Sequence, residues 1–207
     1  MTSFDPLRTA VVAVHLEGDI VGADGALAPL FRAEIERTGV LDKIGQVLRE
    51  ARATGIKVIY TRVAFQPGYP DLIPNSPLLA MTVQHGCLVD GTPGTAIVDE
   101  LAPQAGDVVI THTRVTGFHS SSLDVLLRGS GIDTVVFVGV ATNLSVEGTA
   151  RIASDMGFRT VVVADACSAG SQAAHRASLE SLGLLAEITT TEEFLSSINA
   201  HISGAAR

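Results

Sequence analysis

Short runs of β-branched residues recur along the chain and limit its fold more than any other feature. Five are nearly continuous in valine and isoleucine and a sixth is weaker; in chain order they span residues 10–15, 57–63, 107–112, 134–140, 160–165 and 186–190. Strands buried on both faces of a parallel sheet have this composition, whereas half-exposed strands alternate between apolar and polar residues. We therefore expect a six-stranded, mainly parallel sheet with both faces covered.

Helix-like segments alternate with these runs. Residues 40–54 place apolar side chains at helical spacing, and Gly55 follows as a stop signal. Residues 121–129, 144–156 and 172–182 have similar patterns with glycine at or just past their ends. This alternation predicts an α/β fold, a doubly wound (Rossmann-like) sheet flanked by helices. No repeat or linker divides the chain, so we expect a single domain over residues 1–207.

Residues 65–94 interrupt the alternation. This stretch contains most of the prolines of the chain and few apolar residues in a regular pattern. Proline and glycine favour turns and loops, so we expect a long surface excursion here. Within it, the pattern of residues 77–84 predicts a short helix.

Composition restricts the partners of the protein. The net charge is −8 and no cluster of lysine or arginine stands out, which disfavours a nucleic-acid partner. No segment reaches the roughly 18 apolar residues of a membrane helix, and the first apolar run is too short for a signal peptide. We therefore expect a cytoplasmic protein with a small-molecule ligand. The two cysteines, Cys87 and Cys167, are too few for a disulfide framework and are expected to be small buried residues.

The predicted strand ends carry the polar residues of most interest. His15 closes the first strand, His112 closes the third, and Ser145 lies in the first helical turn after the fourth. In open parallel sheets, ligands bind beyond the carboxyl ends of the strands. A hydroxyl there is close to backbone N–H donors that stabilise an oxyanion, and an imidazole can remove its proton. The pattern alone leaves two other interpretations open: a serine that caps its helix and histidines bonded to nearby backbone.

Other motifs are absent or incomplete. The chain lacks G-x-S-x-G, G-x-x-x-x-G-K-[ST] and G-x-G-x-x-G, which disfavours an α/β-hydrolase elbow, a phosphate loop and a dinucleotide cofactor. A zinc site built on His15, His112 and His119 lacks a clear further ligand, so we expect no metal.

One segment carries a specific resemblance. Residues 138–151 read V-G-V-A-T-N-L-S-V-E-G-T-A-R, which resembles the G-V-x-T-x-x-C-V-x-x-T-A-R signature of the isochorismatase-like (cysteine hydrolase) family. Residues 114–118 resemble the K-x-R-x-S-A-F segment of that family, and residues 9–19 resemble its opening strand. The similarity extends over nearly the whole chain.

The resemblance implies a fold and a chemistry. Members of this family hydrolyse amide or related C–N bonds with an Asp–Lys–Cys triad, need no organic cofactor and are commonly dimers or tetramers. Here the three positions hold His15, His112 and Ser145, so the implied site is Ser–His–His. The family pattern also implies a cis peptide between Val140 and Ala141, with the N–H groups of Ala141 and Ser145 as an oxyanion hole. The metal site that nicotinamidase-like relatives build after their second strand has no counterpart in residues 60–63.

These substitutions leave three functions open. In the first, Ser145 attacks a carbonyl while one histidine is the base and the other orients or protonates. In the second, a vinyl ether is cleaved without a covalent intermediate and His15 supplies the acid. In the third, the protein is a non-catalytic small-molecule-binding or interaction module.

Neighbouring residues have weaker signals. Arg62 and Arg114 are candidates to bind a substrate carboxylate, although we expect Arg114 to form a structural ion pair. Phe118 is either a wall of the pocket or part of the core. Glu17 and Asp19 are interpreted as solvated turn residues in preference to partners of His15. We interpret Cys167, an alternative nucleophile at a strand end, as structural.

Overall fold

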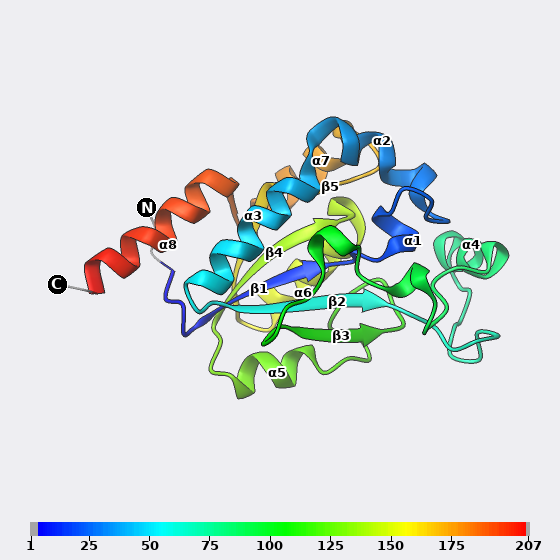
Figure 1. The fold of residues 1–207 in the computed structure, drawn as a ribbon, viewed down its shortest axis with the longest axis horizontal. Coiled ribbons are helices and arrows are strands. Elements are labelled where there is room, and N and C mark those ends of the chain that lie inside the picture. Colours follow the sequence, from blue (N-terminus) through cyan, green and yellow to red (C-terminus); the bar gives the residue numbers. More distant parts are fainter. Residues whose placement is uncertain (1–3, 206–207) are drawn as a thin grey trace.

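A six-stranded parallel sheet forms the centre of the structure, a computed structural model that describes residues 4–205 (Figure 1). The strands are β1 (Thr9–Val14), β2 (Lys57–Val63), β3 (Val108–His112), β4 (Thr134–Val140), β5 (Arg159–Ser168) and β6 (Glu187–Thr189). They pair in the order β3-β2-β1-β4-β5-β6, and every pairing is parallel. The predicted doubly wound α/β fold is confirmed.

Helices cover both faces of this sheet. In chain order they are α1 (Gly18–Val21), α2 (Ala28–Thr38), α3 (Val40–Ala53), α4 (Pro77–His85), α5 (Leu123–Gly129), α6 (Glu147–Asp155), α7 (Gln172–Leu182) and α8 (Thr191–Ala205). Two short 3₁₀ turns, Pro93–Thr95 and Asp99–Leu101, and one π turn, Thr142–Val146, complete the elements. None of the helices within residues 4–205 is long and apolar enough to cross a membrane.

The central strand shows why the runs are continuous in apolar residues. In β1, Val11 and Ala13 belong to the core under α2, α3 and α8. Val12 and Val14 point to the opposite core, under α5, α6 and α7. Every residue of the strand is therefore buried, and all of them after Thr9 are apolar.

The strand order reverses between β1 and β4, and this reversal determines where a ligand can bind. The chain runs outward from β1 through β2 to β3, and from β4 through β5 to β6 on the other side. Crossovers that leave in opposite directions open a crevice at the carboxyl ends of the two central strands. In Figure 1, α1 and α4 lie beyond these strand ends, and Ile20 of α1 and Leu79 of α4 line a cavity there.

Helix α2 was not predicted from the sequence, although its signals are present. It has proline in its first turn and ends at Gly39, whose φ of 61° is the left-handed conformation of a helix stop. Ala28, Phe31 and Ile35 are spaced by three and four residues and are buried. The pattern is short and lies between two turns, so it is weaker than that of α3.

The excursion at residues 65–94 is more deeply packed than expected. Phe65 is fully buried, and Leu72, Leu79 and Leu88 join the core beneath it. The carboxylate of Asp19 accepts a hydrogen bond of 2.7 Å from the N–H of Leu88 and so ties the excursion to the turn after β1. The prediction of a surface excursion is therefore wrong for its apolar residues, whereas the predicted short helix is present as α4.

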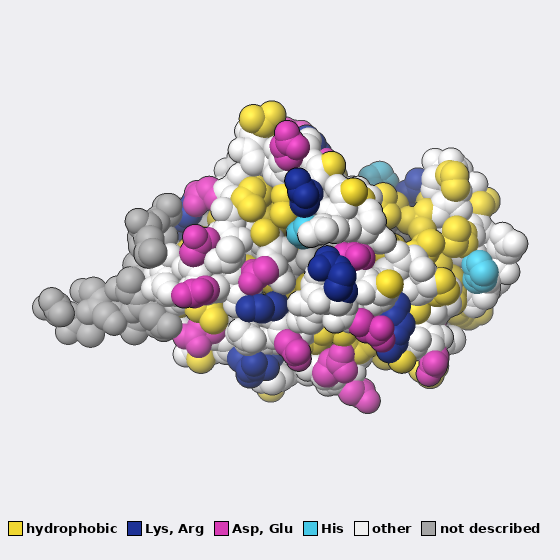
Figure 2. Space-filling view, turned by 90° about the horizontal axis from the view of Figure 1, so that it is seen from above, with side chains coloured by type: hydrophobic (Ala, Val, Ile, Leu, Met, Phe, Trp, Pro, Cys, Tyr) yellow, Lys and Arg dark blue, Asp and Glu magenta, His cyan; other side chains and the backbone are white. Residues whose placement is uncertain are grey.

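Apolar side chains also gather on the surface at this end of the molecule. Figure 2 shows them around the end that carries α1 and α4, whereas acidic and basic side chains are spread over the middle of the same face. This end of the molecule therefore has an apolar surface.

Gly139 permits the close approach of β1 and β4 beside the crevice. Its φ is 130°, and a Cβ atom at this position would collide with the backbone carbonyl of Val14. Only glycine fits where a left-handed conformation and a backbone contact coincide.

We expect Gly139→Ala to lower the free energy of unfolding by about 2–5 kcal/mol, because it adds backbone strain and a steric clash. Urea denaturation measures this change. Gly129→Ala is the matched control, because Gly129 lies at the end of α5 with open space around it. The free energy of unfolding of this variant should equal that of the wild type or exceed it by about 0.5–1 kcal/mol. Equal stability of the two variants would contradict the structural role given to Gly139.

Candidate active site

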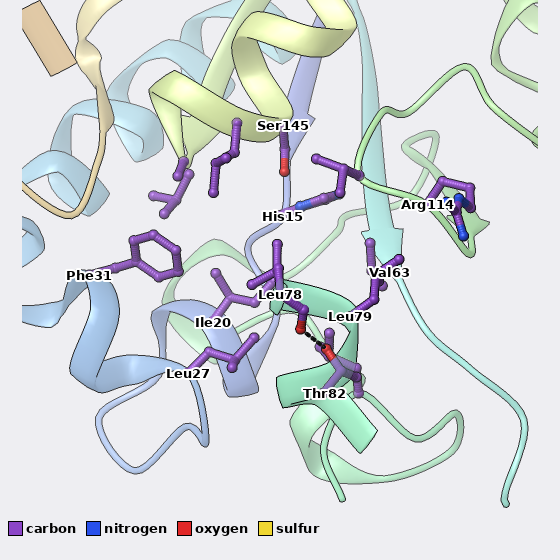
Figure 3. A pocket seen from close by; sticks show the side chains of 15 residues that line it. His15, Ile20, Leu27, Phe31, Val63, Leu78, Leu79, Thr82, Arg114 and Ser145 are labelled. Carbon is purple, nitrogen blue, oxygen red and sulfur yellow. Dashed lines mark hydrogen bonds between the residues drawn. The ribbon is translucent and has the colours of Figure 1, made fainter. Parts of the chain in front are cut away.

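An apolar cavity lies at the carboxyl ends of β1 and β4 (Figure 3). Its empty volume, including the open mouth and the solvent space there, is about 470 Å³. The polar side chains on its wall are His15, Thr82, Arg114 and Ser145. The remaining lining residues are Ile20, Leu27, Phe31, Val63, Leu78, Leu79, Leu88, Val115, Val140, Ala141 and Leu144.

Ser145 lies in the π turn between β4 and α6. The peptide bond between Val140 and Ala141, where the resemblance implies a cis bond, is cis. The carbonyl of Ser145 accepts a hydrogen bond of 2.6 Å from the hydroxyl of Thr149 and fixes the turn. The N-cap residue of the π turn is Ala141 and that of α6 is Val146, and neither helix start has a side-chain capping hydrogen bond. Ser145 is therefore not a helix cap.

His15 adopts an unusual backbone conformation at the end of β1. Its φ is 51°, in the left-handed region that few non-glycine residues occupy. Its N–H donates to the carbonyl of Thr61 over 2.9 Å, which extends the pairing with β2 by one residue. In Figure 3 the ring of His15 points into the cavity, toward the hydroxyl of Ser145.

The two predicted histidines meet although β2 separates their strands. The Nε2 atoms of His15 and His112 are 3.1 Å apart, and both side chains are almost fully buried. The rings stack at an angle of 27° with centroids 5.0 Å apart. Of the two, His15 is a lining residue of the cavity, whereas His112 lies behind it.

The hydrogen bonds of this pair define its protonation. His112 Nδ1 is 2.8 Å from the carbonyl oxygen of Arg114, which can only accept, so this nitrogen carries a proton. Burial lowers the pKa of His112 to about 4, so the ring is neutral at neutral pH and its Nε2 accepts. His15 Nε2 must therefore donate, and His15 Nδ1 retains its lone pair. The pKa of His15 is also well below its ordinary value, mainly because the ring is buried and to a smaller extent because of the neighbouring His112.

Glu17 corrects the prediction of a solvated turn residue. It is fully buried, because the turn after β1 is covered by a β-bridge between Glu17 and Ile97. Its Oε1 accepts from the N–H of Val63, while its Oε2 is buried with no hydrogen-bond partner among the residues that the structure describes. Burial raises the pKa of Glu17 to about 8, so the carboxyl group is largely protonated at neutral pH. Asp19 is likewise structural, because it binds the excursion.

The other candidate residues lie in different places. Arg62 forms an ion pair of 2.9 Å with Asp90 and donates to the carbonyl of Thr95, away from the cavity wall. Arg114 lines the cavity, but it donates to the amide oxygen of Asn75 over 3.1 Å in place of the expected ion pair.

Phe118 and the remaining polar candidates lie outside the cavity wall. Phe118 stacks on Phe158 with centroids 6.3 Å apart and packs against the core of the opposite face. His119 lines an outer groove. Cys167 is buried, and burial raises the pKa of its thiol to about 12, as for a structural cysteine. Within residues 4–205, no group of three or more His, Cys, Asp or Glu side chains is positioned to hold a metal ion.

Sequence reasoning missed several residues around the cavity. Leu27 and Phe31 were overlooked together with α2, and Leu78 and Leu79 belong to the excursion that was expected on the surface. His175 was not considered. Its Nδ1 is 2.8 Å from the hydroxyl of Thr142, in the turn that contains Ser145. The sequence places His175 in the first turn of α7, after the capping residue Ser171, but contains no signal that it contacts Thr142.

An apolar cavity at the switch point of a parallel sheet is the usual place of a small-molecule site in an α/β protein. The chain matches the Isochorismatase domain family over residues 9–193, and it belongs to this family.

Named relatives support the same assignment. Ureidoacrylate amidohydrolase RutB of Methylorubrum extorquens is 31% identical over 96% of this chain and 87% of the relative. The corresponding protein of Stutzerimonas stutzeri is 36% identical over 83% of this chain and 75% of its own. A cysteine hydrolase from Pseudomonas syringae pv. phaseolicola has a TM-score of 0.84 and 28% identity, and the match covers 97% of this chain and 96% of the other.

We expect Glu17→Gln to change how stability depends on pH. Between its ordinary pKa of 4.5 and about 8, the folded protein holds a proton that the unfolded chain has released, so this group lowers stability as the pH rises. The substituted amide would keep an acceptor for the N–H of Val63 without titrating. Between acid pH and above pH 8, the free energy of unfolding of the variant relative to that of the wild type should therefore rise by about 3–5 kcal/mol. Urea denaturation at each pH measures this change.

The exposed Glu100→Gln variant is the control for this experiment. It should follow the wild-type curve over the same interval. If Glu17→Gln also followed the wild-type curve, Glu17 would have to be ionised in the folded protein.

Proposed function

We propose that this protein is a small-molecule hydrolase that cleaves an amide C–N or ester bond, with Ser145 as the nucleophile. The observation that carries the proposal is that Ser145 and His15 line one cavity and face each other there (Figure 3). The amidohydrolases among the relatives support C–N cleavage as the reaction type.

We assign the role of general base to His15. It contacts the cavity, and its lowered pKa keeps the ring neutral, so that its Nδ1 lone pair is available to accept a proton. His112 is a positioning residue: its hydrogen bonds to Arg114 and to His15 hold the base in one tautomer. This division resembles the way a third group orients the histidine in other serine hydrolases.

The proposed reaction has two halves. The Oγ of Ser145 bonds to the carbonyl carbon while its proton passes to His15, and the N–H groups of Ala141 and Ser145 stabilise the oxyanion. His15 then returns the proton to the departing nitrogen or oxygen as the bond to the leaving group breaks. Water, activated by the same histidine, releases the acyl group and regenerates Ser145.

The three substitutions are chemically consistent with one another. A serine hydroxyl is almost entirely protonated at neutral pH, whereas the family's cysteine is partly thiolate, so serine needs a stronger base. Imidazole is a stronger base than the aspartate that this family has at the position of His15. A second imidazole at the lysine position adds no permanent charge, so it leaves the base neutral.

The proposal extends to the setting of the reaction. By its resemblance to the family, we propose a single domain that acts in the cytoplasm as a homodimer or tetramer, without a cofactor or metal.

We expect Ser145→Ala to reduce turnover of p-nitrophenyl esters or small amides by at least about 10³-fold, because the nucleophile is lost. An activated phosphonate, whose leaving group is displaced when the serine oxygen bonds to phosphorus, should add one phosphonyl mass label to the wild type and none to the variant. Cys167→Ala is the control and should be labelled and active. Unchanged vinyl-ether turnover in Ser145→Ala would favour non-covalent vinyl-ether cleavage, and no turnover of amides, esters or vinyl ethers by the wild type would favour a binding module.

The two histidines should give different kinetic results. His15→Gln should lower kcat by about 10²–10⁴-fold through loss of the base. In the wild type, the acid limb of kcat/KM should lie below the ordinary histidine pKa of 6.5, because the folded environment lowers the pKa of His15. His112→Gln should retain part of kcat and move this limb upward, since His112 contributes to that lowering. An unmoved limb with unchanged kcat would contradict the positioning role.

A further inference from the structure

We propose that the acyl group of the substrate is apolar and uncharged, such as a short aliphatic or aromatic acyl chain. This inference rests on the proposed function and names the substrate class of the same site. The reported relative ureidoacrylate amidohydrolase is named for a compound that carries a carboxylate. The cavity of this chain indicates a different preference.

One side of the cavity is built entirely from apolar side chains. Ile20 comes from α1, Leu27 and Phe31 from the start of α2, and Leu78 from α4. In Figure 3 these side chains converge below and to one side of Ser145 and His15. A carbonyl carbon next to Ser145 would therefore have an apolar space for its acyl chain.

A carboxylate in this space would have no partner on the cavity wall. Apart from the neutral His15, Arg114 is the charged side chain among the lining residues, and Figure 3 shows it on the opposite side of Ser145 from Phe31 and Leu27. Moving a charge out of water without a paired group is strongly unfavourable. The wall therefore selects against an acyl chain that ends in a charge.

Arg114 faces the exit of the cavity. It lines both the cavity and the outer groove that contains Asn75 and His119, and its guanidinium donates to Asn75. The leaving group is assigned to this side, where its polar atoms keep contact with water through the groove. The polar part of the substrate would leave past Arg114 while the apolar acyl chain stays against Leu27 and Phe31.

A matched pair of substrates tests the inference. p-Nitrophenyl butyrate and the p-nitrophenyl half-ester of succinate have the same leaving group and acyl chains of similar length, but only the second carries a carboxylate. We expect kcat/KM to favour butyrate by at least about tenfold. Equal or greater activity on the succinate half-ester would overturn the inference and leave the proposed hydrolase function intact.

Two substitutions test which side of the cavity selects the acyl chain. Leu78 is half-buried on the wall, and Leu78→Arg should reduce the butyrate preference by about tenfold or more by pairing with the carboxylate. Phe31→Leu should shift the preference from butyrate toward longer or bulkier acyl chains. Leu30→Ala, on the exposed side of the helix that contains Phe31, should leave unchanged the ratio of kcat/KM for butyrate to that for the succinate half-ester and the ratio for butyrate to that for longer acyl chains. Unchanged ratios in both test variants, with wild-type melting temperatures, would contradict the assignment.

Binding decides the inference if no ester is hydrolysed. The Ser145→Ala variant cannot turn over either ligand by the proposed route, so calorimetry can compare its affinity for butyramide with that for succinamate. We expect butyramide to bind at least about tenfold more tightly. Tighter binding of succinamate would overturn the inference, whereas the absence of hydrolysis in the wild type would count against the proposed function alone.

Discussion

The hydrogen bond between the two buried imidazoles is the interaction on which the rest of the site depends. His15 directly follows β1 and His112 ends β3, with β2 between these strands. Their Nε2 atoms meet 3.1 Å apart beside the last residues of β2, because His15 bonds to Thr61 and His112 pairs with Val63. Because the carbonyl of Arg114 fixes the proton on His112, the protonation of His15 follows without any charged residue. A chain of neutral groups can thus hold a defined tautomer in an apolar surrounding, where an ion pair would need costly desolvation.

The proposed replacement of the family's three catalytic residues is compatible with the fold. The backbone features around the site are formed by elements that the substituted side chains do not build: the turn after β4, the tight approach at Gly139 and the extension of β1 toward Thr61. Side chains at these strand ends can therefore be exchanged while their Cα positions stay fixed. The proposed change from a charged triad to an uncharged one would mainly alter the electrostatics of the cavity, in keeping with its apolar wall.

The sequence predicted the structure best for elements whose burial requires one kind of residue. Strands buried on both faces must be continuous in apolar residues, so β1, β2 and β4 were recognisable, and their ends identified His15 and Ser145. The excursion was misjudged because its prolines indicate turns, whereas the burial of Phe65 depends on core residues that are distant in sequence. Glu17 was misjudged for a similar reason: its polarity predicts exposure, and only the bridge to Ile97 encloses it.

The cavity wall and the polar pair belong to separate parts of the chain. Part of the apolar wall comes from α2 and α4, which lie outside the sheet, whereas His15, His112 and Ser145 lie at or next to the ends of strands. Mutations in the two helices can therefore accumulate without disturbing the reacting groups. Such modularity makes the scaffold suitable for directed evolution, since a library restricted to a few helical positions would explore new ligands on an unchanged chemical framework.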